Sequence, residues 1–166
     1  GSNFIIRCLD SNEYQILNVD KLTYSGNPEN LSDIKSNYNF VCADICDKSI
    51  IRESINNFNP DIIINFAAES HVDRSIDNYS DFINTNILGT INLLDLSLEY
   101  WGKNKNSNFK FIHISTDEVY GSLNNEGSFT ENSAYFPSSP YSASKASSDH
   151  FVNAWHRTFK LPTIIT

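Results

Sequence analysis

The feature that most constrains the fold is an alternation of short apolar runs with longer segments whose apolar residues recur at helical spacing. The clearest run is 61–66, Asp-Ile-Ile-Ile-Asn-Phe, which has the length of one strand. A continuous apolar run of this kind is typical of a parallel strand covered on both faces. No two successive runs are close enough for a tight hairpin, so the connections between strands must cross over. The sequence therefore predicts a doubly wound parallel α/β sheet of the Rossmann-like type.

The expected elements follow from the same spacing and from capping residues. Strands are predicted at 14–19, 40–43, 61–66, 109–115 and 163–166. Helices are predicted at 3–12, from a cap at Asp47 to Pro60, at 79–101, and at 140–159 with Pro140 in the first turn. One apolar stripe of the third helix holds Ile83, Ile87, Ile91, Leu94, Leu98 and Trp101. Loops are predicted at 24–37, with at most a short helix, and at 102–108, which should end the long helix.

Nothing in the chain marks a domain boundary, so residues 1–166 are expected to form one domain. The first predicted element is a helix, and the last strand runs to the end of the sequence. We therefore expect a further strand before Gly1, placed in the middle of the sheet. Without it, two central strands would have unpaired edges with an apolar slot between them, which should destabilise these 166 residues on their own.

Composition narrows the classes of partner. The net charge is −8 and there is no Lys/Arg-rich run, which argues against nucleic acid. No apolar run reaches the roughly 18 residues of a membrane span and no signal peptide opens the chain, so no membrane association and a cytoplasmic location are expected. Cys8, Cys42 and Cys46 match neither an even disulfide set nor a zinc pattern, and we expect buried free thiols and no metal.

Asp20 is the first candidate for cofactor binding. In a doubly wound sheet, ligands bind at the carboxyl ends of the strands, and Asp20 directly follows a predicted strand. A carboxylate there can accept both hydroxyls of an adenosine ribose and repels a 2′-phosphate, which favours NAD over NADP. Asp20 stands 19 residues after Gly1, close to the spacing of a dinucleotide fingerprint, although Gly1 and Ser2 could instead come from cloning.

Two further strand ends carry suitable residues. Asp44 follows the second predicted strand and could reach the adenine amino group. Ala67 and Ala68 follow Phe66 at the third strand end, where small side chains let a pyrophosphate or a ribose approach closely. Each feature alone could be a solvated turn or core packing. Three such strand ends in succession predict a dinucleotide site.

Tyr141 and Lys145 are the candidates for acid–base chemistry. They stand four residues apart at the start of a predicted helix, so they share one face. A tyrosine with a pKa of about 10 is a poor base, and a neighbouring ammonium favours the phenolate. Thr116, at the end of the preceding strand, supplies a hydroxyl that could bind the substrate oxygen. An exposed helical pair without chemistry is the alternative.

Asp117 and Glu118 follow Thr116 directly. Two acids in one site can divide their roles when their environments push their pKa values apart, so that one is protonated and the other ionised. Adjacent carboxylates on a surface loop are more often solvated and idle. Here they follow a buried strand beside the candidate hydroxyl donor, which favours a role in catalysis.

Three segments together carry a resemblance to a known family. They are Thr116-Asp-Glu-Val-Tyr-Gly121, Tyr141-Ser-Ala-Ser-Lys145 and Phe66-Ala-Ala-Glu-Ser-His-Val-Asp-Arg-Ser75. They resemble the extended short-chain dehydrogenase/reductase superfamily and, more closely, the dTDP-glucose 4,6-dehydratases. Asp20-Lys-Leu-Thr-Tyr24 and Pro137-Ser-Ser-Pro140 fit the same family, so the similarity runs from end to end.

The resemblance implies a reaction and a role for each candidate. Tyr141 would take the proton of the sugar 4-hydroxyl as hydride passes from C4 to NAD, with Thr116 holding that oxygen. Glu118 would remove the C5 proton and Asp117 would protonate the departing 6-hydroxyl, after which hydride returns to C6. Lys145 would hold the nicotinamide ribose. The product is a 4-keto-6-deoxy sugar, a deoxysugar precursor. A substrate-binding portion is expected after Thr166, and these 166 residues alone should bind NAD poorly and be inactive.

The resemblance also implies the remaining contacts. Cofactor contacts are expected at Gly1, Asp20, Lys21, Leu22, Thr23, Asp44, Ile45, Phe66, Ala67, Ala68, Ser70, Thr85, Tyr141 and Lys145. Substrate contacts are expected at Ser70, Thr116, Asp117, Glu118 and Tyr141. The substrate would be a nucleotide sugar, with dTDP-glucose favoured, and a homodimer would form through helices 79–101 and 140–159. The alternatives are a UDP-glucose 4,6-dehydratase, a nucleotide-sugar 4-epimerase, or a non-catalytic NAD-binding module.

Overall fold

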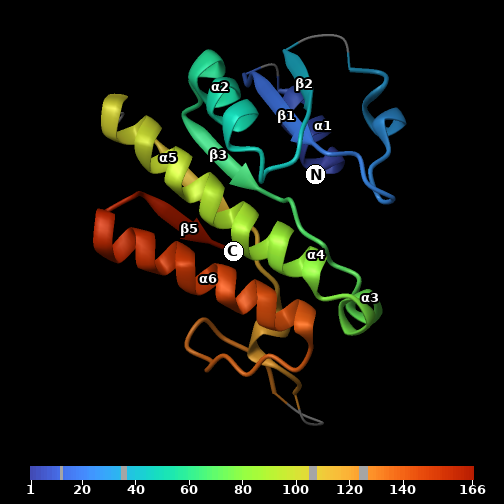
Figure 1. Cartoon of the computed structure of the whole chain (residues 1–166). Coiled ribbons are helices and arrows are strands. Elements are labelled where there is room, and N and C mark those ends of the chain that lie inside the picture. Colours follow the sequence, from blue (N-terminus) through green and yellow to red (C-terminus); the bar gives the residue numbers. More distant parts are fainter. Residues whose placement is uncertain (12, 35–36, 105–107, 124–126) are drawn as a thin grey trace.

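Parallel strands form the framework of the structure (Figure 1). The computed structural model describes residues 1–11, 13–34, 37–104, 108–123 and 127–166. One sheet pairs β1 (Ile16–Asp20) with β2 (Tyr38–Cys42), and the other has the order β3 (Ile62–Asn65), β4 (Lys110–His113), β5 (Thr163–Ile165). Every pairing within these sheets is parallel, as the sequence predicts.

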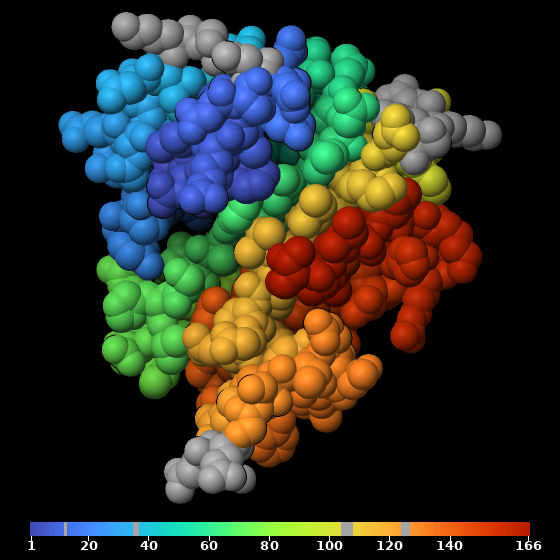
Figure 2. Space-filling view, turned by 180° about the vertical axis from the view of Figure 1, so that it is seen from behind, coloured from blue at the N-terminus to red at the C-terminus, as the bar shows by residue number. Residues whose placement is uncertain are grey.

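Helices connect the strands and cover both sides. They are α1 (Ser2–Asp10), α2 (Lys48–Phe58), α3 (Val72–Asp77), α4 (Ser80–Phe82), α5 (Thr90–Asn104) and α6 (Pro140–Phe159). Two 3₁₀ helices, η1 (Pro28–Leu31) and η3 (Asp117–Tyr120), and a π-helix, η2 (Ile83–Gly89), complete the set in the described residues. The long helices α5 and α6 run side by side in Figure 1 and contact each other. Seen from behind, α1 lies at the front, so it covers the opposite side (Figure 2).

Local signals explain the helix bounds. The Asp47 carboxylate accepts hydrogen bonds from the N–H groups of Ser49 and Ile50, which starts α2, and Asn59 in the left-handed region ends it before Pro60. The prediction for 140–159 coincides with α6. The predicted strands, the helix predicted at 3–12 and the short helix within 24–37 are confirmed, with shifts of a few residues at their ends. Residue 12 of that helix and residues 35 and 36 of the predicted loop lie outside the described residues.

The helix predicted at 79–101 differs from what the structure shows. It starts with α4, passes through the π-helix η2 and continues as α5, so its helical period changes over 83–89. The predicted apolar stripe is therefore confirmed only in its second half: Leu94 is buried and Leu98 and Trp101 pack against the core. Ile83 is 42% exposed, and Phe82, outside the stripe, is buried in its place. The predicted break at 102–108 is wrong for residues 102–104, which remain helical, and residues 105–107 lie outside the described residues. Lys103 bonds Glu99 one turn earlier at 2.9 Å, which stabilises this last turn.

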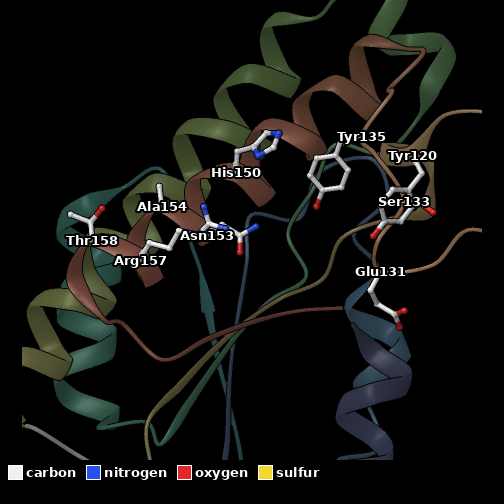
Figure 3. A pocket seen from close by; sticks show the side chains of 9 residues that line it. All are labelled: Tyr120, Glu131, Ser133, Tyr135, His150, Asn153, Ala154, Arg157 and Thr158. Atoms are coloured by element: carbon white, nitrogen blue, oxygen red, sulfur yellow. The ribbon is translucent and has the colours of Figure 1, made fainter.

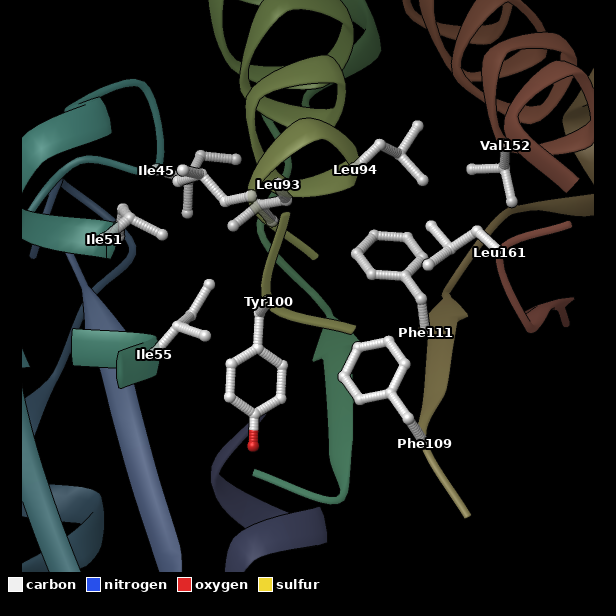
Figure 4. Packing of buried hydrophobic residues seen from close by; sticks show 11 residues of the cluster. Ile45, Ile51, Ile55, Leu93, Leu94, Tyr100, Phe109, Phe111, Val152 and Leu161 are labelled. Atoms are coloured by element: carbon white, nitrogen blue, oxygen red, sulfur yellow. The ribbon is translucent and has the colours of Figure 1, made fainter. Parts of the chain in front are cut away.

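The hydrophobic core lies between the three-stranded sheet and the two long helices (Figure 4). Its fully buried side chains are Leu94 on α5, Phe109, Phe111 on β4, Val152 on α6, and Leu161. Full burial of one such side chain stabilises the fold by about 1.5–3 kcal/mol. This core fixes β4 and α6 relative to each other, and both elements carry candidate catalytic residues at their ends.

β1 and β3 face each other without pairing. A cavity of about 720 Å³ lies between them, lined by Ile16, Leu17 and Val19 of β1 and by Ile62, Ile63 and Ile64 of β3. This is the apolar slot that the sequence predicts. The expectation that the run 61–66 is covered on both faces is wrong at its start, because Ile62 is 48% exposed where β3 borders the cavity.

Candidate active site and cofactor site

The start of α6 positions the first candidate catalytic residue. Ser139 and Ser142 form a reciprocal capping box, and Pro140 occupies the first helical turn. Tyr141 is thereby held on the first turn, where its backbone N–H donates to Ser75 Oγ at 3.2 Å. Its ring packs edge-on against Phe82, with the ring centres 6.4 Å apart. The phenol is 8% exposed, so a substrate would meet a preorganised group.

The segment after β4 brings three more candidates to the same place. The Thr116 hydroxyl caps η3 by accepting a hydrogen bond from the Glu118 N–H at 3.3 Å, and it lies 3.5 Å from Asp117 Oδ1. Asp117 and Glu118 are exposed, whereas Thr116 is half-buried. The charges of both carboxylates raise the pKa of Tyr141, and the Thr116 hydroxyl lowers it. The two acids and the hydroxyl are therefore close enough to Tyr141 to affect its protonation.

The electrostatics of Tyr141 differ from the sequence-based expectation. Burial raises the pKa of the phenol above its ordinary value of about 10, the hydrogen bond with Thr116 opposes this shift, and the charges of Glu118 and Asp117 add to it. The net shift is upward, whereas the pairing with Lys145 predicts a downward one. The physical reason is that the Lys145 ammonium is turned to the Ile114 carbonyl oxygen, to which it donates at 2.6 Å.

Lys145 itself is 3% exposed. Burial lowers the pKa of its ammonium, and the charge of Asp149, one helical turn further on, opposes that shift. The alternative predicted an exposed helical pair, and this exposure is wrong, because both Tyr141 and Lys145 are buried.

The candidate cofactor residues lie at the carboxyl ends of β1 and β2 and on the turns that follow. Asp20 Oδ1 accepts a hydrogen bond from the Leu22 N–H at 2.8 Å, which holds the turn and places Leu22 at a φ of 52°. Lys21 Nζ and Asp44 Oδ2 pair at 3.0 Å. Burial raises the pKa of Asp44, but the backbone N–H of Cys46 and the ion pair outweigh it and leave that pKa below its usual value.

The carboxyl end of the cavity between β1 and β3 collects most of these residues. Gly1, Asp20, Lys21, Thr23, Asp44, Ile45, Phe66, Ala67, Ala68 and Thr85 line it. Leu22, Ser70, Tyr141 and Lys145 are not part of its lining, so the structure does not join the cofactor candidates and the catalytic candidates in one cavity. Ser70 is exposed on the segment after Ala68.

The residues present fit an NAD molecule. Asp20 leaves one carboxylate oxygen without a protein hydrogen bond in the described residues, at the position where a ribose diol would bind. Gly1 caps α1 without a side chain, so the N–H groups of the first turn can face a pyrophosphate. The half-buried Ala67 and Ala68 leave room beside them. The acidic Asp20 disfavours a 2′-phosphate, which is the distinction between NAD and NADP.

Several buried polar residues that support the site were missed by the sequence analysis. Asn86 accepts from the Glu69 N–H at 2.8 Å and donates to the Glu69 carbonyl at 2.9 Å and to Ser144 Oγ at 2.8 Å. It therefore fixes the segment after β3 against α6. Asn86 lies in the π-helix, and such helical irregularities are frequent at functional sites. A signal existed for Asn65, a polar residue within an apolar strand, but none for Ser75.

Within the described part of the chain, no cluster of three or more His, Cys, Asp or Glu side chains is arranged to hold a metal ion. None of the described helices is long and apolar enough to span a membrane. Cys8, Cys42 and Cys46 are free thiols, as predicted. The prediction that they are buried is wrong, because Cys8 is only partly buried and Cys42 and Cys46 are exposed.

The whole chain, residues 1–166, matches one protein family, described as GDP-mannose 4,6 dehydratase. The chain belongs to the GDP-mannose 4,6 dehydratase family. The match extends over both sheets, both cofactor strand ends and the segment of the candidate catalytic residues. The parallel α/β fold predicted from the sequence is that of this family's solved relatives.

Two of the similar proteins are dTDP-glucose 4,6-dehydratases, and a third is a UDP-glucose 4-epimerase. The chain is 52% identical to a dTDP-glucose 4,6-dehydratase of Salmonella typhimurium, over 100% of this chain and 50% of the relative. A dTDP-glucose 4,6-dehydratase of Streptomyces venezuelae, solved with NAD bound, is 40% identical with a TM-score of 0.89, over 99% of this chain and 51% of that one. A UDP-glucose 4-epimerase of Thermotoga maritima is 27% identical with a TM-score of 0.85, over 99% and 50%. The chain spans about half the length of the relatives it matches.

Proposed function

We propose that the protein containing this chain is an NAD-dependent dTDP-glucose 4,6-dehydratase, a carbon–oxygen lyase. The observation that carries this proposal is the placement of Asp117 and Glu118 at the end of β4, where both charges act on the buried Tyr141. Oxidation of an alcohol needs one base. Removal of water from the neighbouring carbons needs a second base and an acid, and these two carboxyl groups supply them.

The first step is oxidation at C4 of the sugar. Tyr141 takes the proton of the 4-hydroxyl, and the Thr116 hydroxyl holds the same oxygen as it becomes a carbonyl. NAD, when bound, accepts the hydride from C4 and later returns it to C6. Lys145 lies one helical turn beyond Tyr141, and we expect it to hold the nicotinamide ribose.

The second step is elimination of water. The C4 ketone acidifies the hydrogen at C5, and Glu118 takes that proton. Asp117 gives a proton to the C6 hydroxyl, which leaves as water, so a double bond forms between C5 and C6. Once hydride has returned to C6, Glu118 would return the proton to C5. The sum is loss of one water, with no net oxidation.

Two related activities are the alternatives. A 4-epimerase leaves the 6-hydroxyl in place and needs no acid–base pair at C5 and C6, so Asp117 and Glu118 favour the dehydratase. The 52% and 40% identities to dTDP-glucose 4,6-dehydratases, against 27% to a UDP-glucose 4-epimerase, point in the same direction. The assignment of the nucleotide as dTDP, and not UDP or GDP, rests on these relatives alone.

The test uses the intact gene product with NAD and dTDP-glucose carrying deuterium at C4. The expected product has lost the mass of one water and carries the deuterium at C6. An isomer of unchanged mass would indicate an epimerase, and preferred turnover of UDP-glucose or GDP-mannose would overturn the assignment of the base. Absence of any reaction with all three sugars would leave an NAD-binding module.

We also propose that the protein forms a homodimer through its long helices. Apolar side chains are exposed on the π-helix η2 that leads into α5 and at the end of α6: Ile83 is 42%, Leu88 50% and Phe159 46% exposed. Phe151, Trp155 and Phe159 form an aromatic row on α6, with successive ring centres 6.1 and 5.6 Å apart. Light scattering of the intact gene product tests this, and a monomer at micromolar concentration would contradict it. The free cysteines fit a reducing compartment such as the cytoplasm.

A further inference from the structure

Ser75 on α3 carries a buried hydroxyl that the proposed reaction does not use. It is 0% exposed, whereas the next residue of this short helix, Ile76, is 66% exposed. Its Oγ donates a hydrogen bond to the Val72 carbonyl oxygen and accepts one from the Tyr141 N–H at 3.2 Å. A carbonyl oxygen only accepts and a backbone N–H only donates, so the direction of both bonds is fixed. Ser75 therefore links the segment after β3 to the first turn of α6.

The first turn of α6 explains why this link is needed. The first four N–H groups of a helix find no partner within the helix itself. In α6 the Ser139 N–H donates to Ser142 Oγ at 2.9 Å, and the Ser142 N–H donates to Ser139 Oγ at 3.0 Å. Pro140 has no N–H. Among these four residues, 139–142, the Tyr141 N–H is the donor that remains, and Ser75 satisfies it.

The carbonyl group of Tyr141 is held as well. Ser144 Oγ donates to it at 2.7 Å and accepts from Asn86 Nδ2 at 2.8 Å. Both backbone polar groups of Tyr141 are thus bonded to serine hydroxyls, one from α3 and one that Asn86 of η2 holds in turn. The ring packs against Phe82 of α4. The position of this base therefore depends on the segment between β3 and α5 as well as on α6.

The helix that carries Ser75 is anchored on the cofactor side. The Arg74 guanidinium lies 3.9 Å from the ring centre of Tyr24, in the segment after β1. A guanidinium over an aromatic face is attracted by the electrons of the ring. Thr23, which precedes Tyr24, lines the cavity between β1 and β3. Helix α3 therefore contacts the cofactor turn through Arg74 and the catalytic turn through Ser75.

The place of Ser75 distinguishes a positioning role from ligand binding. Ser75 is not part of the lining of the cavity between β1 and β3. It is not part of the lining of a second cavity either, which has a volume of about 680 Å³ and lies beside His150, Asn153 and Arg157 of α6 (Figure 3). Because the hydroxyl is fully buried and lines neither cavity, it serves the protein backbone and not a substrate or a cofactor.

We propose that Ser75 is a positioning residue for oxidation at C4: its hydroxyl fixes the first turn of α6, so that the Tyr141 hydroxyl stays within reach of the sugar 4-hydroxyl. This inference rests on the proposed function. Without the Ser75 hydroxyl, the Tyr141 N–H would be a buried donor without a partner, and the turn would shift to find one. Small displacements of a catalytic group cost much of the rate.

Ser75→Ala in the intact gene product removes this hydrogen bond and leaves the rest of the side chain. We expect single-turnover hydride transfer from C4 to slow by about 10–100-fold at saturating NAD and sugar. The affinities for NAD and sugar should stay unchanged, because Ser75 lines neither cavity. Ser97→Ala is the matched control, since Ser97 on α5 is also 0% exposed but its Oγ has no hydrogen-bond partner in the described part of the chain. The rate of this control should match that of the unmodified enzyme.

A double-mutant cycle decides whether Ser75 acts through Tyr141. In the Tyr141→Phe background the hydroxyl that must be positioned is gone, so Ser75→Ala should slow the residual rate by at most about twofold. A loss as large in that background as in the unmodified enzyme would show that Ser75 acts on another part of the site, and would overturn the proposal. So would an unchanged rate in Ser75→Ala, an equal loss in Ser97→Ala, or a loss that weaker binding of NAD or sugar explains.

A second measurement does not depend on activity or on the folding of Ser75→Ala. Nitrogen-15 NMR of labelled tyrosines in the unmodified gene product reports the exchange of the Tyr141 amide with deuterated water, and the signal is assigned by its absence in Tyr141→Phe. We expect this amide to exchange at least about 100-fold more slowly than an unstructured one, because Ser75 holds it. Exchange at the unstructured rate would overturn the proposal. If the sugar is not oxidised, the proposed function fails, while the amide exchange still shows whether Ser75 holds the first turn of α6.

Discussion

The two sheets of the molecule hold their candidate functional residues in different ways. In β1 and β2 no side chain is fully buried, and Asp20 and Asp44 are positioned by hydrogen bonds to backbone N–H groups two residues further on. In the other sheet, β4 buries Phe111 and His113, and α6 buries Tyr141 together with its neighbours. The cofactor candidates thus depend on local turns, whereas the catalytic candidates depend on packing between elements.

The difference matches the chemistry proposed for each region. A dinucleotide is a large ligand that supplies many contacts, and turn residues can adjust to it. Proton transfer needs a base placed within hydrogen-bonding distance, and small displacements cost much of the rate. We therefore expect substitutions around β4 and α6 to have larger effects than comparable ones around β1 and β2.

The largest expected effect concerns Tyr141. Tyr141→Phe in the intact gene product should slow hydride transfer from C4 by about 10²–10⁴-fold, the usual contribution of a general base. Single-turnover formation of NADH measures it. Asp20→Asn, the counterpart on the cofactor side, should weaken NAD binding and slow hydride transfer much less at saturating NAD. Equal losses of hydride transfer in both variants would contradict the contrast between the regions.

The two acids after Thr116 allow a sharper test of the same region. Asp117→Asn should still oxidise C4 but stall before water is lost, because the leaving hydroxyl lacks its proton donor. Glu118→Gln should suppress exchange of the C5 hydrogen with deuterated solvent. Mass spectrometry of the quenched sugar distinguishes these outcomes. If both variants lose every step to the same extent, the acids do not divide the work as proposed.

A matched pair of phenylalanines compares the two sheets in stability. Phe111 on β4 is 0% exposed and Phe40 on β2 is 41% exposed. Phe111→Ala should lower the free energy of unfolding by about 3–5 kcal/mol, as in other buried positions, because it leaves a cavity in the core. Phe40→Ala should cost less than about 1 kcal/mol. Urea denaturation of the intact gene product measures both, and similar costs would mean that β2 is packed as tightly as β4.

Sequence patterns predicted the elements whose signals are local. The bounds of α6 follow from a serine cap and a proline, and α2 starts at the Asp47 cap. The π-helix could not be predicted in this way, since it coincides with hydrogen bonds that Asn86 makes to a distant segment. Helix α3, from Val72 to Asp77, was also missed because six residues give no periodic pattern.

The candidate site shows the same division. Tyr141, Lys145 and Thr116 were found from spacing and from their place after a strand. Asp149 gave no signal, because an acid among serines on a helix is usually exposed, and only the fold places it against Ser115 and β4. The pKa of Tyr141 was predicted to shift downward, whereas burial raises it. The spacing of two residues does not show how deeply they are buried.

Acid should destabilise the catalytic region through His113. The unfolded chain takes up a proton at this residue near pH 6.5, whereas burial lowers its pKa to about 3 in the folded protein. Between these values the unfolded state binds more protons, so stability falls as the pH decreases, by at most about 1.4 kcal/mol per pH unit. His113→Gln should reduce the pH dependence of unfolding between pH 6.5 and 3 by about one proton. An unchanged slope would show that His113 is charged in the folded protein.

The smallest expected effect comes from the caps of two helices. The two caps should contribute similarly to the free energy of unfolding, but only one of them holds a turn with a candidate catalytic residue. Asp47 caps α2 with two hydrogen bonds of 3.1 Å, and Ser139 caps α6 with one of 3.0 Å to the Ser142 N–H within a reciprocal box. Replacing either residue by Ala should lower the free energy of unfolding by about 1 kcal/mol. Only Ser139→Ala should also slow hydride transfer, by a few-fold, because Tyr141 lies on the turn that this cap holds. Asp47→Ala changes a helix whose first turn carries no candidate catalytic residue, so its rate should match that of the unmodified enzyme. If both variants slow the reaction equally at a temperature where both are folded, the catalytic residues depend on overall stability, and packing around α6 does not set their geometry.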